Sequence, residues 1–194
     1  MKGITASAIA AFAVIVPSAG AAIGITQAPA GPGYKNLTPY PNSNPGPDQG
    51  RCVGTAGYFS STDTNVRLQF GWFANTQGGI KQFFMNSHGS VQIVQTNGSD
   101  TLNDSWSATK NGSGPVSTLG IAWTDNEAGT GTPPGSTSKV TGVAGFYRAR
   151  ITSIAPGEYT LTQTTVLDKG VSDGWATYAA GTVFTSSCYF TVNP

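Results

Sequence analysis

The sequence has few charged residues. Lysine, arginine, aspartate and glutamate together make up 10% of its 194 residues, and the formal net charge at pH 7 is +1. An average globular domain carries about 25% charged residues. The chain therefore lacks the basic stripe that binds nucleic acid and the polybasic segment that binds an anionic membrane surface. We expect no nucleic-acid partner, which leaves proteins and glycans at the cell surface as partner classes.

Histidine is almost absent, because His88 is the only one. A Ser-His-Asp triad would have to use it, in a predicted turn that is a poor place to hold an imidazole rigidly against a nucleophile. Zinc and copper sites built on histidine need at least two nitrogen or sulfur ligands. The pattern "NSHG" (residues 86–89) predicts a turn with a solvated imidazole. We therefore predict that the protein is not an enzyme.

No apolar run is long enough to cross a bilayer. The longest spans residues 4–16, whereas a membrane helix needs about 20 residues. Lys2 precedes the run, and small residues including Ala19 and Ala21 follow it. This order is typical of a secretory signal peptide, and we predict cleavage after Ala21. The expected mature protein is secreted and has no stable insertion in a membrane.

Two other interpretations of the N-terminus remain open. One is an uncleaved membrane anchor. The other is the core helix of a filament, because Lys2-Gly3 followed by Ile4-Thr5 resembles the start of archaeal type IV pilins. That resemblance implies a subunit of an extracellular filament.

Cysteine is scarce, with two residues in the whole chain, Cys52 and Cys188. An even count in a secreted chain indicates a disulfide, and two cysteines allow one intramolecular pairing. A metal pair or a catalytic thiol would need a neighbouring histidine or a Cys-x-x-Cys spacing, and neither is present. We predict a Cys52–Cys188 disulfide.

Glycine and proline are abundant instead, at 26 and 12 residues. Prolines are dense in residues 22–50, a composition that favours an extended arm over a central strand. We expect this arm to be a spacer or to dock on a neighbouring subunit, which allows self-association. From residue 51 to 194 the pattern changes to short alternating runs separated by Gly, Asn and Pro.

These runs predict an all-β domain, a single antiparallel β-sandwich of immunoglobulin-like or jelly-roll-like type. Within it, "GGIKQFFMNSHGSVQIVQTNGSD" (residues 78–100) is interpreted as two strands joined by the turn at 86–89. The segment "TDNEAGTGTPPG" (residues 124–135) is interpreted as a loop.

A short motif has a counterpart in a known family. "ITSIAPGEYTLT" (residues 151–162) resembles the corner between sheets in fibronectin type III and related immunoglobulin-like domains, where a Pro-Gly turn precedes an inward-facing tyrosine. The resemblance implies a sandwich and carries no function. The cysteine positions differ from the antibody-type pairing across the middle of the sandwich.

Two groups of residues are candidates for binding. Trp175 and Tyr178, in the connection "SDGWATYAAG", could stack on sugar rings, or Trp175 could fold back to cap the sandwich. Asp125 and Glu127 are spaced to hold Ca²⁺ within a loop, which is the one cofactor we consider. Asp100 and Asp104 form a second, looser acidic group.

Four Asn-x-Ser/Thr sequons predict glycosylation at exposed positions: Asn36, Asn97, Asn103 and Asn111. Taken together, the sequence favours a secreted, non-enzymatic structural or interaction protein at the cell exterior, such as an adhesin-like, surface-assembly or host-facing module. A carbohydrate-binding module that uses exposed aromatic residues is the alternative.

Overall fold

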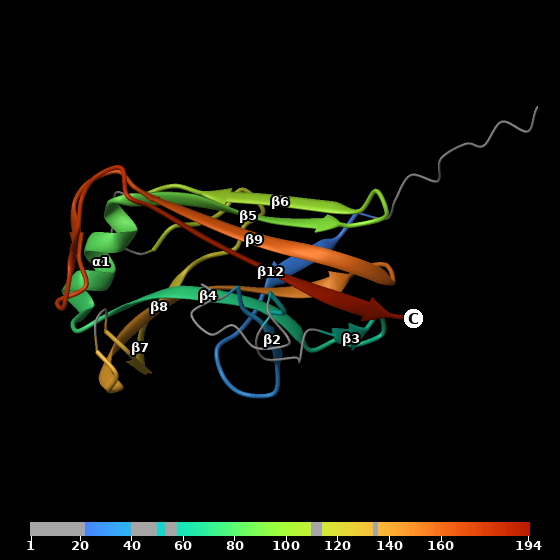
Figure 1. Ribbon diagram of the computed structural model, residues 1–194, viewed down its shortest axis with the longest axis horizontal. Coiled ribbons are helices and arrows are strands. Elements are labelled where there is room, and N and C mark those ends of the chain that lie inside the picture. Colours follow the sequence, from blue (N-terminus) through green and yellow to red (C-terminus); the bar gives the residue numbers. More distant parts are fainter. Residues whose placement is uncertain (1–21, 40–49, 53–57, 110–113, 134–135) are drawn as a thin grey trace, which may run out of the picture.

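Two β-sheets pack face to face, with one short helix at one end of the molecule (Figure 1). The computed structural model describes residues 22–39, 50–52, 58–109, 114–133 and 136–194. The expected all-β sandwich is confirmed. The expected signal peptide, residues 1–21, lies outside the described residues. None of the helices in the described part is long and apolar enough to span a membrane.

Each sheet contains five strands. The first sheet is formed by β1 (Gly24–Gln27), β2 (Lys35–Leu37), β4 (Val66–Ala74), β7 (Thr124–Gly131) and β8 (Val140–Ser153). The second sheet is formed by β3 (Tyr58–Ser60), β5 (Ser87–Gln95), β6 (Thr101–Trp106), β9 (Gly157–Leu167) and β12 (Val183–Asn193). Helix α1 (Gln77–Met85) and the strand pair β10 (Val171–Ser172) and β11 (Thr177–Tyr178) complete the structure.

Most strand pairs are antiparallel, and two edge strands are exceptions. In the second sheet β9 lies between β5 and β12, and β6 and β3 occupy the edges. In the first sheet β4 and β8 form the central pair. Strand β2 runs parallel to β4, and β3 runs parallel to β12. The purely antiparallel arrangement that the sequence predicted is therefore wrong at these edges. A long connection can bring the chain back in the same direction as the neighbouring strand, whereas a tight hairpin always reverses it.

The first half of one predicted hairpin is a helix. Residues 77–85 form α1, so the strand interpretation of "GGIKQFFM" and the turn at 86–89 are wrong. The Thr76 hydroxyl accepts a hydrogen bond from Gly79 N–H and caps the helix. Ile80, Phe83 and Phe84 have the spacing of one helical face, and all three are buried. Burial of this apolar face against the core therefore stabilises the helix over a strand. Strand β5 begins at Ser87, shortly after the helix ends.

The segment expected to be a Ca²⁺-binding loop is largely strand β7. It pairs with β8 from Thr124 to Gly131, with a register shift between Thr124 and Glu127. The prediction of a loop is therefore wrong for residues 124–131.

Parts of the proline-rich arm belong to the first sheet. Strand β1 pairs with β8, and β2 pairs with β4, both at outer positions of the sheet. Ile23 and Leu37 are buried in the hydrophobic core. Both described segments therefore pair within their own subunit, and self-association through the arm stays a prediction. Residues 40–49 of the arm lie outside the described residues.

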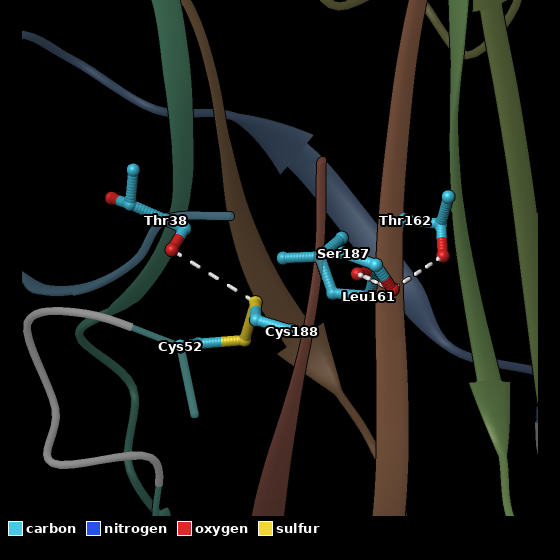
Figure 2. The surroundings of a disulfide bond; sticks show 6 residues. All are labelled: Thr38, Cys52, Leu161, Thr162, Ser187 and Cys188. Atoms are coloured by element: carbon cyan, nitrogen blue, oxygen red, sulfur yellow. Dashed lines mark hydrogen bonds between the residues drawn. A yellow bond between two sulfur atoms is a disulfide. The ribbon is translucent and has the colours of Figure 1, made fainter. Parts of the chain in front are cut away.

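A disulfide joins the segment after the arm to the last strand, as the sequence predicted. Cys52 and Cys188 are bonded and almost fully buried, and they are separated by 136 residues (Figure 2). Backbone hydrogen bonds on either side, Cys52 N–H to Tyr189 O and Tyr189 N–H to Gly50 O, hold residues 50–52 along β12. Closing a loop of this length constrains the unfolded chain by about 5 kcal/mol in the loop-entropy model.

The tyrosine after the Pro-Gly corner faces the core. Tyr159 is fully buried, and its hydroxyl donates to Ala155 O at 2.9 Å, four residues upstream. Its ring stacks on Phe190 of β12. The bond explains why a tyrosine stands at this corner, since the buried ring needs a partner for its hydroxyl.

Candidate binding surface

The outer face of the second sheet carries neutral hydrogen-bonding side chains. Strands β5, β6, β9 and β12 alternate strictly, so Val91, Ile93 and Leu161 face the core while their neighbours face outward. We call part of this outward set the polar face: Ser90, Gln92, Asn103, Ser105, Thr160, Thr162, Thr164, Thr185 and Ser187. Each of these side chains carries a hydroxyl or an amide, and none carries a charge. His88, Val94, Glu158 and Val183 also face outward and lie outside the polar face.

The strand register arranges the polar face in rows. One row is Ser105, Ser90, Thr164 and Thr185, and the next is Asn103, Gln92, Thr162 and Ser187. Neighbouring strands lie about 4.8 Å apart, and alternate residues along a strand lie about 6.8 Å apart. The result is a regular grid of hydrogen-bonding groups over four strands.

Cross-strand hydrogen bonds fix the orientation of these groups. Gln92 Nε2 donates to Asn103 Oδ1 at 2.9 Å. The hydroxyls of Thr162 and Ser187 lie 3.0 Å apart, and Ser187 also bonds to Leu161 O (Figure 2). Side chains held in this way lose little conformational entropy when they bind a ligand.

The face is hollowed at its centre and has aromatic rings at one end. A depression of about 250 Å³ is lined by Ser90, Val91, Gln92, Asn103, Asp104, Ser105, Thr162 and Thr164. Tyr58 on β3 is 55% exposed and Tyr189 on β12 is 40% exposed. Both are large enough to stack on a flat apolar surface such as the face of a sugar ring.

The aromatic pair considered for sugar binding packs back onto the sandwich. Trp175 is half-buried and stacks on Phe73 with ring centroids 5.2 Å apart. Tyr178 is half-buried against Trp72, and its hydroxyl donates to Asp173 Oδ2 at 2.8 Å. Burial, followed by the hydrogen bond to Asp173, raises the pKa of Tyr178 to about 12. The alternative in which Trp175 caps the sandwich describes this arrangement.

Three of the carboxylates considered for Ca²⁺, Glu127, Asp104 and Asp100, already have protein partners. Both oxygens of Glu127 accept hydrogen bonds from the guanidinium of Arg148, which is 4% exposed. Asp104 is buried on β6 and accepts a bond from Tyr147, and Asp100 is buried beneath the Tyr159 hydroxyl. Among the residues that the structure describes, no three acidic, histidine or cysteine side chains converge on one point.

His88 lies on β5, so its placement in a turn is wrong. Its Nδ1 is 2.8 Å from Asp168 Oδ1, and both side chains are nearly half exposed. This pair gives His88 the orienting partner that the sequence did not reveal. Within the described ranges no hydroxyl forms a hydrogen bond with the other ring nitrogen of His88.

The sequons differ in accessibility. Asn97 is exposed in the turn between β5 and β6, as expected. Asn103 lies on strand β6 and Asn36 on strand β2, not in open loops. Asn36 is half-buried, and its Oδ1 accepts a hydrogen bond from Nε of the buried Arg67. Asn111 lies outside the described residues.

Sequence reasoning missed the polar face because its signal is distributed over four strands. Each strand shows polar residues at alternate positions, but the rows require the register, which a single sequence does not give. Comparison with protein-family models, with curated proteins and with solved structures finds no match to this chain.

Proposed function

We propose that this chain is a secreted, non-enzymatic binding protein of the cell exterior and that the polar face binds a neutral glycan. The observation that carries the proposal is the pair of complete rows of hydroxyl and amide groups across four strands. Glycans offer hydroxyls that both donate and accept, and Ser, Thr, Asn and Gln side chains match them without a charge.

Two further features support the proposal. The exposed ring of Tyr58 can stack on the apolar face of a sugar at the end of the hydrogen-bonding rows, whereas the Arg51 guanidinium already lies over the ring of Tyr189, 5.1 Å from its centroid. The buried disulfide is typical of proteins that work in an oxidising, extracellular environment.

The experiment is retention of residues 22–194 on insoluble polysaccharides. Cellulose, chitin and β-1,3-glucan serve as probes, and a glycan array extends the panel. We expect at least one polysaccharide to retain the chain. The triple variant Gln92→Ala, Thr162→Ala and Thr164→Ala should weaken retention at least tenfold, because each lost hydrogen bond contributes about 0.5–1.5 kcal/mol.

The matched control is Thr141→Ala, an exposed threonine on β8 of the other sheet. It should bind as the parent does. A chain that no glycan in the panel retains would contradict glycan binding. Retention that the triple variant leaves unchanged would show that the polar face is not the site.

A further inference from the structure

One side of the sandwich lacks edge strands over part of its length. Strand β2 pairs with β4 only at residues 66–68. Strand β12 is covered by residues 50–52 and by β3 only from Tyr189 onward. In the part of the chain that the structure describes, the outer backbone edges of residues 69–74 and 183–187 have no strand partner.

A groove lies between these two unpaired edges. Its volume is about 650 Å³, within the usual range of binding pockets, and both edges contribute to its lining. The aromatic side chains Phe70, Trp72 and Phe184 line it from the core side. None of the lining residues carries a charge. A ligand of this groove is therefore neutral and largely apolar where it touches the protein.

Buried polar groups also line the groove. Gln163 is 9% exposed, although it occupies a core-facing position on β9. Its Nε2 donates to the Thr165 hydroxyl. The indole N–H of Trp72, which also lines the groove, is a buried group without a hydrogen-bond partner among the described residues, and it can donate to an occupant.

The groove extends over both faces of β4. Phe70 and Trp72 point inward, whereas Gln69, Gly71 and Phe73 belong to the outer face of the first sheet, and all five line the groove. Phe146, beside Gly71 on β8, continues the outer part. A compact ligand in the core would meet only the inner set. A strand added to the free edge of β4 would meet both sets, because its side chains alternate between the two faces.

We propose that the free edge of β4 at residues 69–74 binds an extended, uncharged peptide segment whose apolar side chains occupy alternate positions. The peptide backbone pairs with the unpaired groups of β4. Its inward side chains pack on Trp72 and Phe184, and its outward side chains lie beside Gly71 and Phe73. This site adjoins the polar face, with which it shares Thr185, and it recognises a protein partner.

The test uses hydrogen exchange on residues 22–194. The probe is an acetylated, amidated peptide in which valine and threonine alternate between terminal lysines. We expect saturating peptide to slow amide exchange in residues 69–74 at least tenfold. The edge of β6 on the other sheet that has no strand partner among the described residues, at residues 101–104, should be unaffected. The same peptide with a central proline should bind at least tenfold more weakly, because proline lacks the donor that pairs with the edge.

Two exposed valines provide matched variants. Val183→Glu places a charge at the mouth of the groove and should weaken peptide binding at least tenfold. Val116→Glu, at a similarly exposed valine away from the groove, should not change it. Both positions are more than half exposed, so the fold tolerates the charge.

Three results would overturn the proposal. The first is unchanged exchange in residues 69–74 with saturating peptide. The second is protection of these residues that rises with protein concentration and needs no peptide, which would assign the edge to a second copy. The third is peptide binding that appears only when residues 40–49 are replaced by a glycine-serine linker, which would assign the edge to the chain itself.

Discussion

The hydroxyl of Tyr147 donates to Asp104 Oδ2 at 2.7 Å and joins the two sheets through the core. Tyr147 lies on β8 and Asp104 on β6, and the two side chains are 0% and 2% exposed. The Thr118 hydroxyl and Leu119 N–H donate to Asp104 Oδ1 at 2.8 and 2.9 Å. The buried carboxylate is therefore tied to both layers and to the loop before β7.

Removing the tyrosine hydroxyl should destabilise the fold. Tyr147→Phe keeps the ring, which stacks on Phe70 at 4.6 Å, and removes one donor from the buried carboxylate. We expect a loss of about 1–3 kcal/mol in the free energy of unfolding, measured with urea. Tyr58→Phe, at an exposed position, is the control and should have little effect. Equal stability of the Tyr147 variant and the parent would show that the bond contributes nothing net.

The folded protein should lose stability at alkaline pH. Burial, then the hydrogen bond to Asp104, raises the pKa of Tyr147 above its usual value of 10.0. Burial, then the charge of Asp100, raises the pKa of Tyr159 to about 12. Tyrosines of the unfolded chain ionise first, so the stabilising contribution is complete below pH 10 and decreases as pH rises toward 12.

Urea midpoints measured at about pH 8 and about pH 11 provide the check, together with tyrosinate absorbance in the folded state. A midpoint that does not fall at the higher pH would contradict the buried, protonated state of these hydroxyls.

The disulfide should contribute several kcal/mol. Replacing both Cys52 and Cys188 with serine releases a 136-residue loop, and we expect a loss of about 2–5 kcal/mol. Reduction of the parent protein should produce a similar loss. Alkylation of the native protein without reductant should add no label, and two labels under these conditions would show that the bond is not formed.

Leu37 in β2 should be essential to stability. Leu37→Ala removes a side chain that is fully buried between the sheets, with an expected cost of about 2–5 kcal/mol. The neighbouring Lys35 forms an exposed ion pair with Asp63 at 2.7 Å, and its hydrogen bond lowers the pKa of that carboxyl. Lys35→Ala is the control in the same strand and should change stability much less. If the two variants had the same melting temperature, the arm would be a spacer.

The exposed pair of His88 and Asp168 should contribute little to the free energy of unfolding. Both side chains are nearly half exposed, so His88→Ala should change the free energy of unfolding by less than about 1 kcal/mol. Retention on polysaccharides should not change, because the hydroxyl and amide rows do not include His88. Loss of an enzymatic activity in this variant would contradict the non-enzymatic account.

The fold class and the disulfide followed from local patterns. Alternation identifies strands such as β9 and β12, and two cysteines leave one pairing. Helix α1 was predicted as a strand because its apolar residues, Ile80, Phe83 and Phe84, are too few to distinguish the two periods without the core they contact. The sequence did not predict the edge strands β2 and β3, because three residues are too few to show a strand pattern. These strands are recognised only from their pairing with β4 and β12.

The candidate surface could not be derived from the sequence, because it depends on register. Ser90, Thr164 and Thr185 come from three separate strands, and only their alignment makes a row. Trp175 and Tyr178, in contrast, were considered as a binding site from the sequence, but their surroundings in the structure differ from that expectation. Their residue types suggested sugar binding, but the cavity-filling contacts with Phe73 and Trp72 take up both rings.

The most direct test of glycan binding maps the contact residue by residue. Backbone amide shifts of the isotope-labelled chain are recorded while a soluble oligosaccharide of the retained polysaccharide is added. We predict that the largest shifts fall on outward residues of β5, β9 and β12, centred on Gln92, Thr162 and Ser187, and extend to Tyr189. Shifts centred on Trp175 and the end of the molecule near α1, with the polar face unchanged, would contradict the account.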